Sequence, residues 1–189
     1  MSTTRPIRVL GIAGSLRQSS YNKAALRAAR ELLPNGATLE IADLDGLPLF
    51  NEENERPLPP RVVELKARIR EADAILIATP EYNYSVPGVL KNAIDWASRP
   101  SGDNAWDGKP VALMGASPGP QGTARAQYHL RQTFVFLNMY PVNQPEVMIS
   151  NAAQRFDAQG QLVDERMRAR IRQLLEALVT WTRRLGKAS

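Results

Sequence analysis

Short apolar runs alternate along the chain with stretches in which apolar residues recur every three or four positions. The apolar runs lie at residues 7–13, 74–78 and 111–116, residues 38–42 alternate in polarity, and a further strand is expected within residues 139–149. The periodic stretches, predicted to be amphipathic helices, lie at residues 21–32, 62–72, 90–97, 126–137 and 163–185. Since strands and helices alternate about five times, the pattern predicts a parallel sheet covered by helices on both faces.

The chain has 189 residues, which favours one domain spanning residues 1–189. In open sheets of this kind, ligands bind beyond the carboxyl ends of the strands, where the strand order reverses. For a five-stranded sheet in the order 2-1-3-4-5, the first and third strands flank that point. The loops after these two strands are therefore the first places to search for a site.

The loop after the first strand, residues 14–22, is rich in hydroxyl groups and carries one arginine. A strand, such a loop and then a helix can hold a phosphate, because hydroxyls, free backbone N–H groups and the helix N-terminus all favour an anion. Arg17 adds a full positive charge. The loop lacks the three glycines of a dinucleotide fingerprint and the Gly-Lys-Ser/Thr of a P-loop. The alternative is a plain turn in which Ser20 or Asn22 caps the helix.

Two further loops would lie at the same edge of the sheet. Tyr82 and Tyr84, between Pro80 and Pro87, supply rigid apolar faces for a flat heteroaromatic ring, and Asn83 supplies a donor and an acceptor. The glycine-rich loop at residues 117–122 lets the backbone approach a ligand closely. The alternative is that the tyrosines pack at the surface, but the clustering of three unusual loops favours one site.

The cysteine and histidine content excludes several kinds of metal and redox site. There is no cysteine and one histidine, His129, which excludes disulfides, iron–sulfur clusters, thiolate zinc sites and multi-histidine metal centres. No metal site is predicted, and redox chemistry would need a bound organic cofactor.

Net charge and hydropathy indicate which classes of partner the protein binds. The net charge is +5, with many arginines in the C-terminal helix. A solvated helix face explains them better than nucleic-acid binding, because no basic and aromatic residues interleave. No apolar run approaches the roughly 20 residues of a membrane span, and the first apolar run is short and interrupted. We therefore expect a cytoplasmic protein that binds neither nucleic acid nor membrane.

The motifs, taken together, resemble those of the NADPH-dependent FMN reductases, a flavodoxin-like family that includes bacterial quinone and chromate reductases. The similarity extends from about Ile7 to Ile149 in order and spacing. Its longest segment is residues 80–96, PEYNYSVPGVLKNAIDW, and its others are GSLR with Ser20 and Asn22, and Ser117-Pro118-Gly119 with the following RAQYHLRQ. Thr123 departs from the family, many of whose members have glycine there, and this could change the shape of the ring-side loop.

The resemblance implies a three-layer flavodoxin-like fold that binds FMN without a covalent bond. Four residues would hold the phosphate end of FMN: Ser15, Arg17, Ser20 and Asn22. Six would line the isoalloxazine ring, largely through backbone groups: Pro80, Glu81, Tyr82 and Asn83 on one side, and Ser117 and Gly119 on the other. NADPH or NADH would deliver a hydride through FMN to a small electron acceptor such as a quinone, chromate, an azo or nitro compound, or free flavin. No catalytic side chain is predicted, because the flavin carries the chemistry.

The resemblance also implies a homodimer or homotetramer. The helix at residues 89–98, with Asp95 and Trp96, is the expected dimer contact. Arg125, Tyr128 and Glu146 match positions near the assembly interface and pocket of quinone and chromate reductases.

Three other classes of protein share parts of this pattern. Gly115-Ala116-Ser117-Pro118-Gly119 matches the nucleophile elbow of a hydrolase, but Pro118 has no N–H for an oxyanion hole, and His129 lies inside a predicted helix. An electron-carrying flavodoxin shares the fold, and stabilisation of a one-electron reduced state would favour it. A phosphorylation receiver domain needs clustered aspartates, where this chain has Gly14-Ser15 and Thr79-Pro80.

Overall fold

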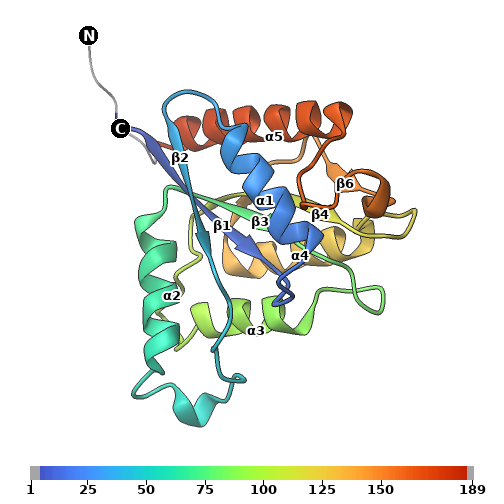
Figure 1. Cartoon of the computed structure of the whole chain (residues 1–189). Helices are drawn as coiled ribbons and strands as arrows, with labels where there is room; N and C mark the ends of the chain where they lie inside the picture. Colours follow the sequence, from blue (N-terminus) through green and yellow to red (C-terminus); the bar gives the residue numbers. More distant parts are fainter. Residues whose placement is uncertain (1–4, 187–189) are drawn as a thin grey trace.

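A parallel sheet runs through the middle of the molecule and separates two layers of helices (Figure 1). The computed structural model describes residues 5–186. The strands are β1 (Ile7–Ala13), β2 (Ala37–Ala42), β3 (Ala74–Ala78), β4 (Pro110–Ala116), β5 (Tyr140–Pro141) and β6 (Val147–Ile149). The helices are α1 (Tyr21–Glu31), α2 (Pro60–Glu71), α3 (Gly88–Ala97), α4 (Ala124–Leu137) and α5 (Glu165–Arg184), with 3₁₀ turns at Glu52–Asn54 and Ala152–Gln154.

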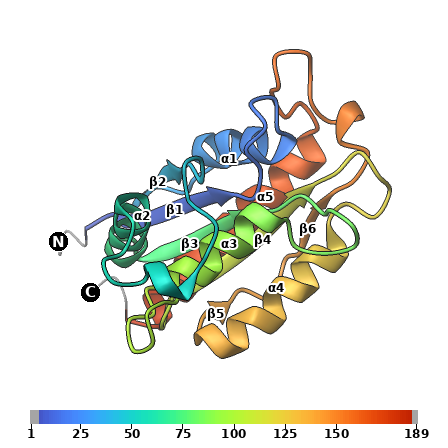
Figure 2. The same cartoon turned by 90° about the horizontal axis from the view of Figure 1, so that it is seen from below.

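The central strands are buried on both faces, as their continuous apolar runs predict. In β3, Leu76 packs into the core shared with α1 and α5, whereas Ile75 and Ile77 pack into the core shared with α2, α3 and α4. Figure 2 shows the same division, with α1 and α5 on one face of the sheet and the other three helices on the opposite face. Successive side chains of a strand point to opposite faces, so one strand contributes to both cores.

The strand order β2-β1-β3-β4-β5 confirms the predicted order 2-1-3-4-5. The single fifth strand that we predicted within residues 139–149 is wrong in detail, because β5 and β6 both pair with β4. Pro141 of β5 pairs with Val111 of β4, and Val147 of β6 pairs with Met114 of β4. The edge segment therefore has more residues between these two pairings than β4 has, and residues 142–146 bulge out of the sheet. Pro141 and Pro145 donate no N–H to a ladder, which accounts for the interruption at this edge.

The last helix starts later than its apolar period predicts. Asp164 is its N-cap, with a side chain that accepts from Met167 N at 2.9 Å, and the helix begins at Glu165. Val163 therefore lies outside the helix and is 55% exposed rather than part of its buried face. Just before it, Phe156 and Leu162 pair as an antiparallel bridge, and this narrow turn brings the chain back to α5.

Backbone hydrogen bonds connect the carboxyl ends of the strands. Gly14 N donates to Ala78 O at 2.9 Å, and Thr79 N donates to Met114 O at 3.0 Å. The loops after β1, β3 and β4 consequently start side by side at one edge of the sheet, as we predicted, and Figure 2 shows them at the end to which the arrows point.

Candidate functional site

The loop between β1 and α1 presents a helix N-terminus to whatever lies beyond the sheet. Ser20 is the N-cap of α1, and its Oγ accepts from Asn22 N at 3.2 Å and from Lys23 N at 3.4 Å. Ser15 is buried, and its Oγ accepts from Arg17 N at 3.4 Å. These hydroxyls fix the loop, and of the two residues that the alternative interpretation offered as the cap, Ser20 or Asn22, Ser20 is the N-cap.

Several N–H groups of this loop have no acceptor. Within residues 5–186, no hydrogen bond is made by the backbone N–H of Ser15, Leu16, Gln18 or Ser19. At the start of the loop, a Cβ on Gly14 would lie 3.2 Å from both Leu90 and Pro80, so glycine allows the chain to turn closely past α3. Free N–H groups around a helix N-terminus are the arrangement that binds phosphate.

We predicted that Asn22 would bind the phosphate of FMN, but its side chain binds another part of the chain. Its side-chain amide is buried, donates to Ala116 O at 2.9 Å and accepts from Ala116 N at 2.9 Å. The amide is therefore committed to the end of β4 and is not free for a ligand. It ties the first loop to the third one and so positions both.

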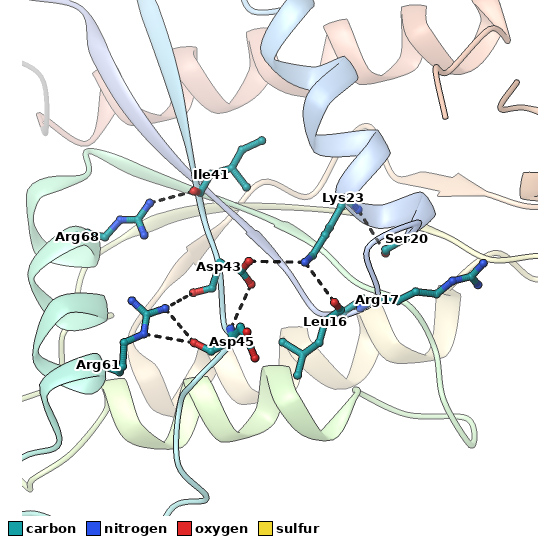
Figure 3. A network of polar contacts seen from close by, with 10 residues as sticks. Leu16, Arg17, Ser20, Lys23, Ile41, Asp43, Asp45, Arg61 and Arg68 are labelled. Carbon is teal, nitrogen blue, oxygen red and sulfur yellow. Dashed lines mark hydrogen bonds and ion pairs between the residues drawn. The ribbon is translucent and has the colours of Figure 1, made fainter. Parts of the chain in front are cut away.

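A lysine of α1 hydrogen-bonds to the backbone of the phosphate loop. Lys23 Nζ donates to Leu16 O at 3.4 Å and lies 3.7 Å from Asp43 (Figure 3). The Arg17 side chain extends away from this network in Figure 3, and its Nε donates to Ser19 Oγ at 2.9 Å. No carboxylate in the described part of the chain pairs with Arg17, which leaves its charge available to an anion.

The loop after β3 contains a tight hairpin that sequence reasoning missed. Tyr82 and Ser85 exchange both backbone hydrogen bonds, at 3.2 and 3.0 Å, and close a two-residue turn. Both turn residues are left-handed, Asn83 with φ of 49° and Tyr84 with φ of 66°. This conformation costs a non-glycine residue about 1 kcal/mol or more, and such strain tends to occur at functional sites.

Glu81 supports this hairpin through α4. One carboxylate oxygen accepts from Arg125 N at 3.0 Å and Ala126 N at 3.2 Å, and the other accepts from Arg125 Nε at 2.6 Å. The hydrogen bond that Arg125 donates to Glu81 raises the pKa of the guanidinium above its ordinary value. The same guanidinium lies 3.6 Å above the centre of the Tyr84 ring, which fixes the strained residue. The Glu81 side chain is thus a support, while its backbone N–H is free of acceptors in the described residues.

A second residue of α4 holds the far end of the hairpin. His129 Nδ1 and Ser85 Oγ lie 2.9 Å apart. His129 contacts neither Ser117 nor any carboxylate among residues 5–186, and the Ser117 Oγ accepts from Gly119 N at 3.1 Å. The constellation that a serine hydrolase needs is therefore missing from the described chain.

The third loop is packed against β4 and the segment after β6. Ser117 O accepts from Ala152 N at 3.0 Å, and Gly119 O accepts from Asn151 N at 3.1 Å. Thr123 is fully buried, and its Oγ1 accepts from Gln127 Nε2 at 3.0 Å. Thr123 therefore fills space beneath the loop and does not face a ligand.

The comparisons with known proteins agree with this geometry. A family model described as NADPH-dependent FMN reductase matches residues 7–154. The chain is a member of the NADPH-dependent FMN reductase family. It is 59% identical over 180 residues to an NAD(P)H-dependent FMN reductase of Pseudomonas aeruginosa, covering 95% of this chain and 97% of that protein.

Two further relatives of this FMN reductase family member differ in their described activities. A 2-hydroxy-1,4-benzoquinone reductase of a Burkholderia species is 41% identical, with 94% of this chain and 97% of that protein covered. The solved structure of FerB, a flavoenzyme NAD(P)H:(acceptor) oxidoreductase of Paracoccus denitrificans, matches with a TM-score of 0.87. The two sequences are 36% identical, and the match covers 94% of this chain and 98% of the FerB chain.

The residues of this family member fit FMN at the edge of the sheet. The unpaired N–H groups of Ser15, Leu16, Gln18 and Ser19 and the uncompensated Arg17 side chain suit the flavin phosphate. The backbone N–H groups of Glu81 and Asn83 have no acceptor within residues 5–186, and the hairpin offers them to a ring edge. Of the ten predicted site residues, nine lie on the three adjoining loops, and the side chains of Asn22 and Glu81 are committed to Ala116 and Arg125.

The residues expected at a subunit contact separate into two groups. Trp96 is fully buried inside its own chain, where its Nε1 donates to Pro48 O at 2.8 Å, so the prediction that it contacts a partner is wrong. Asp95 is partly exposed and pairs with Lys91 at 2.7 Å. Tyr128 is 49% exposed, whereas the Arg125 guanidinium is paired within the chain.

Proposed function

We propose that this protein is an FMN-dependent NAD(P)H oxidoreductase that reduces quinones and similar acceptors, including chromate, azo and nitro compounds and free flavin. Bound FMN would supply the hydride relay between the nicotinamide and the acceptor. The observation that supports the proposal best is the meeting of a cationic phosphate loop and a strained hairpin at one edge of the sheet. The quinone reductase among the relatives adds support for the acceptor class.

We propose that the residues of the chain bind FMN and orient its ring. Ser15, Arg17 and Ser20 would hold the phosphate, and backbone groups of Pro80, Glu81, Tyr82 and Asn83 would line one side of the ring. Ser117 and Gly119 would line the other. Arg125 and His129 keep the hairpin in place from α4 and need not touch the flavin.

The first experiment is an anaerobic titration of the purified protein with NADPH, followed by its visible spectrum. We expect a yellow protein that is bleached directly to two-electron-reduced flavin and then reoxidised by a quinone. A yellow protein that NADPH leaves unchanged would favour the electron-carrier alternative. A colourless protein that FMN does not restore would contradict the proposal.

We further propose that the chain acts as a homodimer or homotetramer in the cytoplasm. No helix within residues 5–186 is long and apolar enough to cross a membrane. The outer face of α4 exposes large apolar side chains, with Val135 83% and Phe136 90% exposed near its C-terminal end. We propose these side chains as part of a contact with a second copy, in line with the assembly that the family resemblance implies.

Replacing Phe136 with glutamate is expected to shift the chain toward the monomer, because association would bury a charge. Light scattering coupled to size-exclusion chromatography measures the mass directly. Val63→Glu is the control, since Val63 is 52% exposed on α2, away from this face. An unchanged oligomer in the Phe136 variant, or a monomeric wild type, would contradict the proposed interface.

A further inference from the structure

A cavity of about 560 Å³ lies beside α1, past the phosphate loop. One wall is formed by Arg17, Gln18 and Ser19 of the loop and by Tyr21 and Arg27 of α1, and the opposite wall by residues 157–160. Its volume is in the range of cavities that hold nucleotides and other small ligands. The flavin site described above does not account for its far end.

Two cations in this cavity have no anionic partner. Arg125, for comparison, is paired with Glu81 at 2.6 Å. Arg17 and Arg27 make no ion pair within residues 5–186, although Arg27 is only partly exposed. Asp157 also lines the cavity, but its Oδ1 accepts from Gln159 N at 3.0 Å and from Gln161 N at 2.8 Å within its own turn. Because Arg17 is assigned to the flavin phosphate, Arg27 is the cation of this cavity that remains without an ion pair within residues 5–186.

The backbone of Arg27 is set back along α1 from the helix N-terminus, where the flavin phosphate is proposed to bind. It follows the N-cap Ser20 by seven residues, which is about 10 Å along the helix axis. An anion bound on the far side of the Arg27 guanidinium would be a second anion, separate from one held by residues 15–20. Arg17, at the mouth of the loop, lies between the two positions.

The walls of the cavity are suited to a rigid ligand. The Tyr21 ring packs on Phe156 with the ring centres 5.2 Å apart, which fixes one aromatic face. Gly160 has φ of 74°, and a Cβ at this position would lie 3.3 Å from Arg27 Nη2. Glycine thus permits the turn and leaves the guanidinium room to meet a ligand.

We propose that this cavity binds the adenosine 2′-phosphate end of NADPH, and that Arg27 determines the preference for NADPH over NADH. The inference rests on the proposed function, because it assigns the nucleotide that reduces the flavin. A guanidinium binds a phosphate monoester through two charged hydrogen bonds, and NADH has a hydroxyl where NADPH has this group. The cavity adjoins the phosphate loop through Arg17, Gln18 and Ser19, so a nucleotide that reaches the flavin could place its adenosine end there.

The test compares Arg27→Ala with Arg30→Ala in the FMN-loaded protein. Arg30 is exposed on the last turn of the same helix and does not line the cavity, so it controls for the loss of one charge. We expect the KM for NADPH to rise about tenfold or more in Arg27→Ala while the KM for NADH changes less than twofold. Arg27→Gln, which removes the charge but keeps a polar side chain on three carbons, is the second variant should the alanine variant fold poorly.

A binding measurement gives a readout that does not depend on turnover. Adenosine 2′-monophosphate, inorganic phosphate and adenosine are titrated into the FMN-loaded protein by calorimetry. We expect adenosine 2′-monophosphate to bind more tightly than the other two, and its affinity to fall in Arg27→Ala but not in Arg30→Ala. Equal affinity for inorganic phosphate would overturn the nucleotide assignment.

The two proposals fail in different ways. If NADH and NADPH both reduce the flavin and Arg27→Ala keeps the wild-type KM for NADPH, this inference is wrong and the proposed function stands. If neither nucleotide reduces the flavin, the proposed function is wrong, and the calorimetric comparison still decides whether the cavity binds a 2′-phosphate.

Discussion

Gly115→Ala is expected to destabilise the protein by about 3 kcal/mol or more. A Cβ at position 115 would overlap Thr123 Oγ1 and the backbone oxygen of Thr79. The threonine side chain has little room to move, because Thr123 is fully buried and accepts a hydrogen bond from Gln127. Thr79 directly follows β3 and its N–H donates to Met114 O of β4 at 3.0 Å, so relief of the overlap would require the backbone at the end of the sheet to shift.

Urea unfolding of the apoprotein measures this loss without interference from a bound ligand. Gly88→Ala is the matched control: it removes another glycine of the site region, but a Cβ there meets nothing within 4 Å. Gly88 is the first residue of α3, so alanine is expected to leave the free energy of unfolding unchanged or to raise it by up to about 1 kcal/mol. Equal stability of the Gly115 variant and wild type would mean that β4 and Thr123 do not pack as described.

Thr123 illustrates what the sequence cannot show. From the family pattern alone, threonine in place of glycine predicts a change in the ring-side loop. The structure places it beneath the loop, opposite Gly115, eight positions earlier in the chain. Gly115 on β4 leaves the space that Thr123, before α4, occupies. This pairing depends on the folded contact between the two residues, and a single sequence does not reveal it.

The parts of the site that depend on local chemistry could be predicted. The alternative of Ser20 or Asn22 as a helix cap followed from residue type, because both side chains can accept from free N–H groups of the first turn, and Ser20 does so. The three loops were expected at one edge because parallel strands end on the same side of a sheet. Both conclusions need only the order of elements and the residue types at their ends.

The contacts that depend on distant residues could not be predicted. Asn22 binds Ala116 and Glu81 caps α4, and each pair is separated by more than forty residues in the chain. Trp96 follows the apolar period of its helix whether it is covered by its own chain or by a partner, so periodicity could not decide between them. Tyr84 adopts a left-handed conformation for which its residue type has no preference.

Replacing Ser20 with aspartate is expected to weaken FMN binding at least about 100-fold relative to asparagine at the same position. Aspartate and asparagine both cap helices, so either side chain can accept from the N–H groups of Asn22 and Lys23 as Ser20 does. The two variants differ in one charge. That charge lies at the N-terminus of α1, where the phosphate of FMN is proposed to bind.

The comparison isolates electrostatics from folding. Aspartate interacts favourably with the helix dipole, so the apoprotein of Ser20→Asp should be at least as stable as that of Ser20→Asn. A loss of FMN affinity without a loss of stability can then come only from repulsion between carboxylate and phosphate. Quenching of flavin fluorescence on titration of FMN with apoprotein gives both dissociation constants. Equal constants would place the phosphate away from this helix, and the Arg17 side chain and the free N–H groups of Ser15, Leu16, Gln18 and Ser19 would then need another ligand.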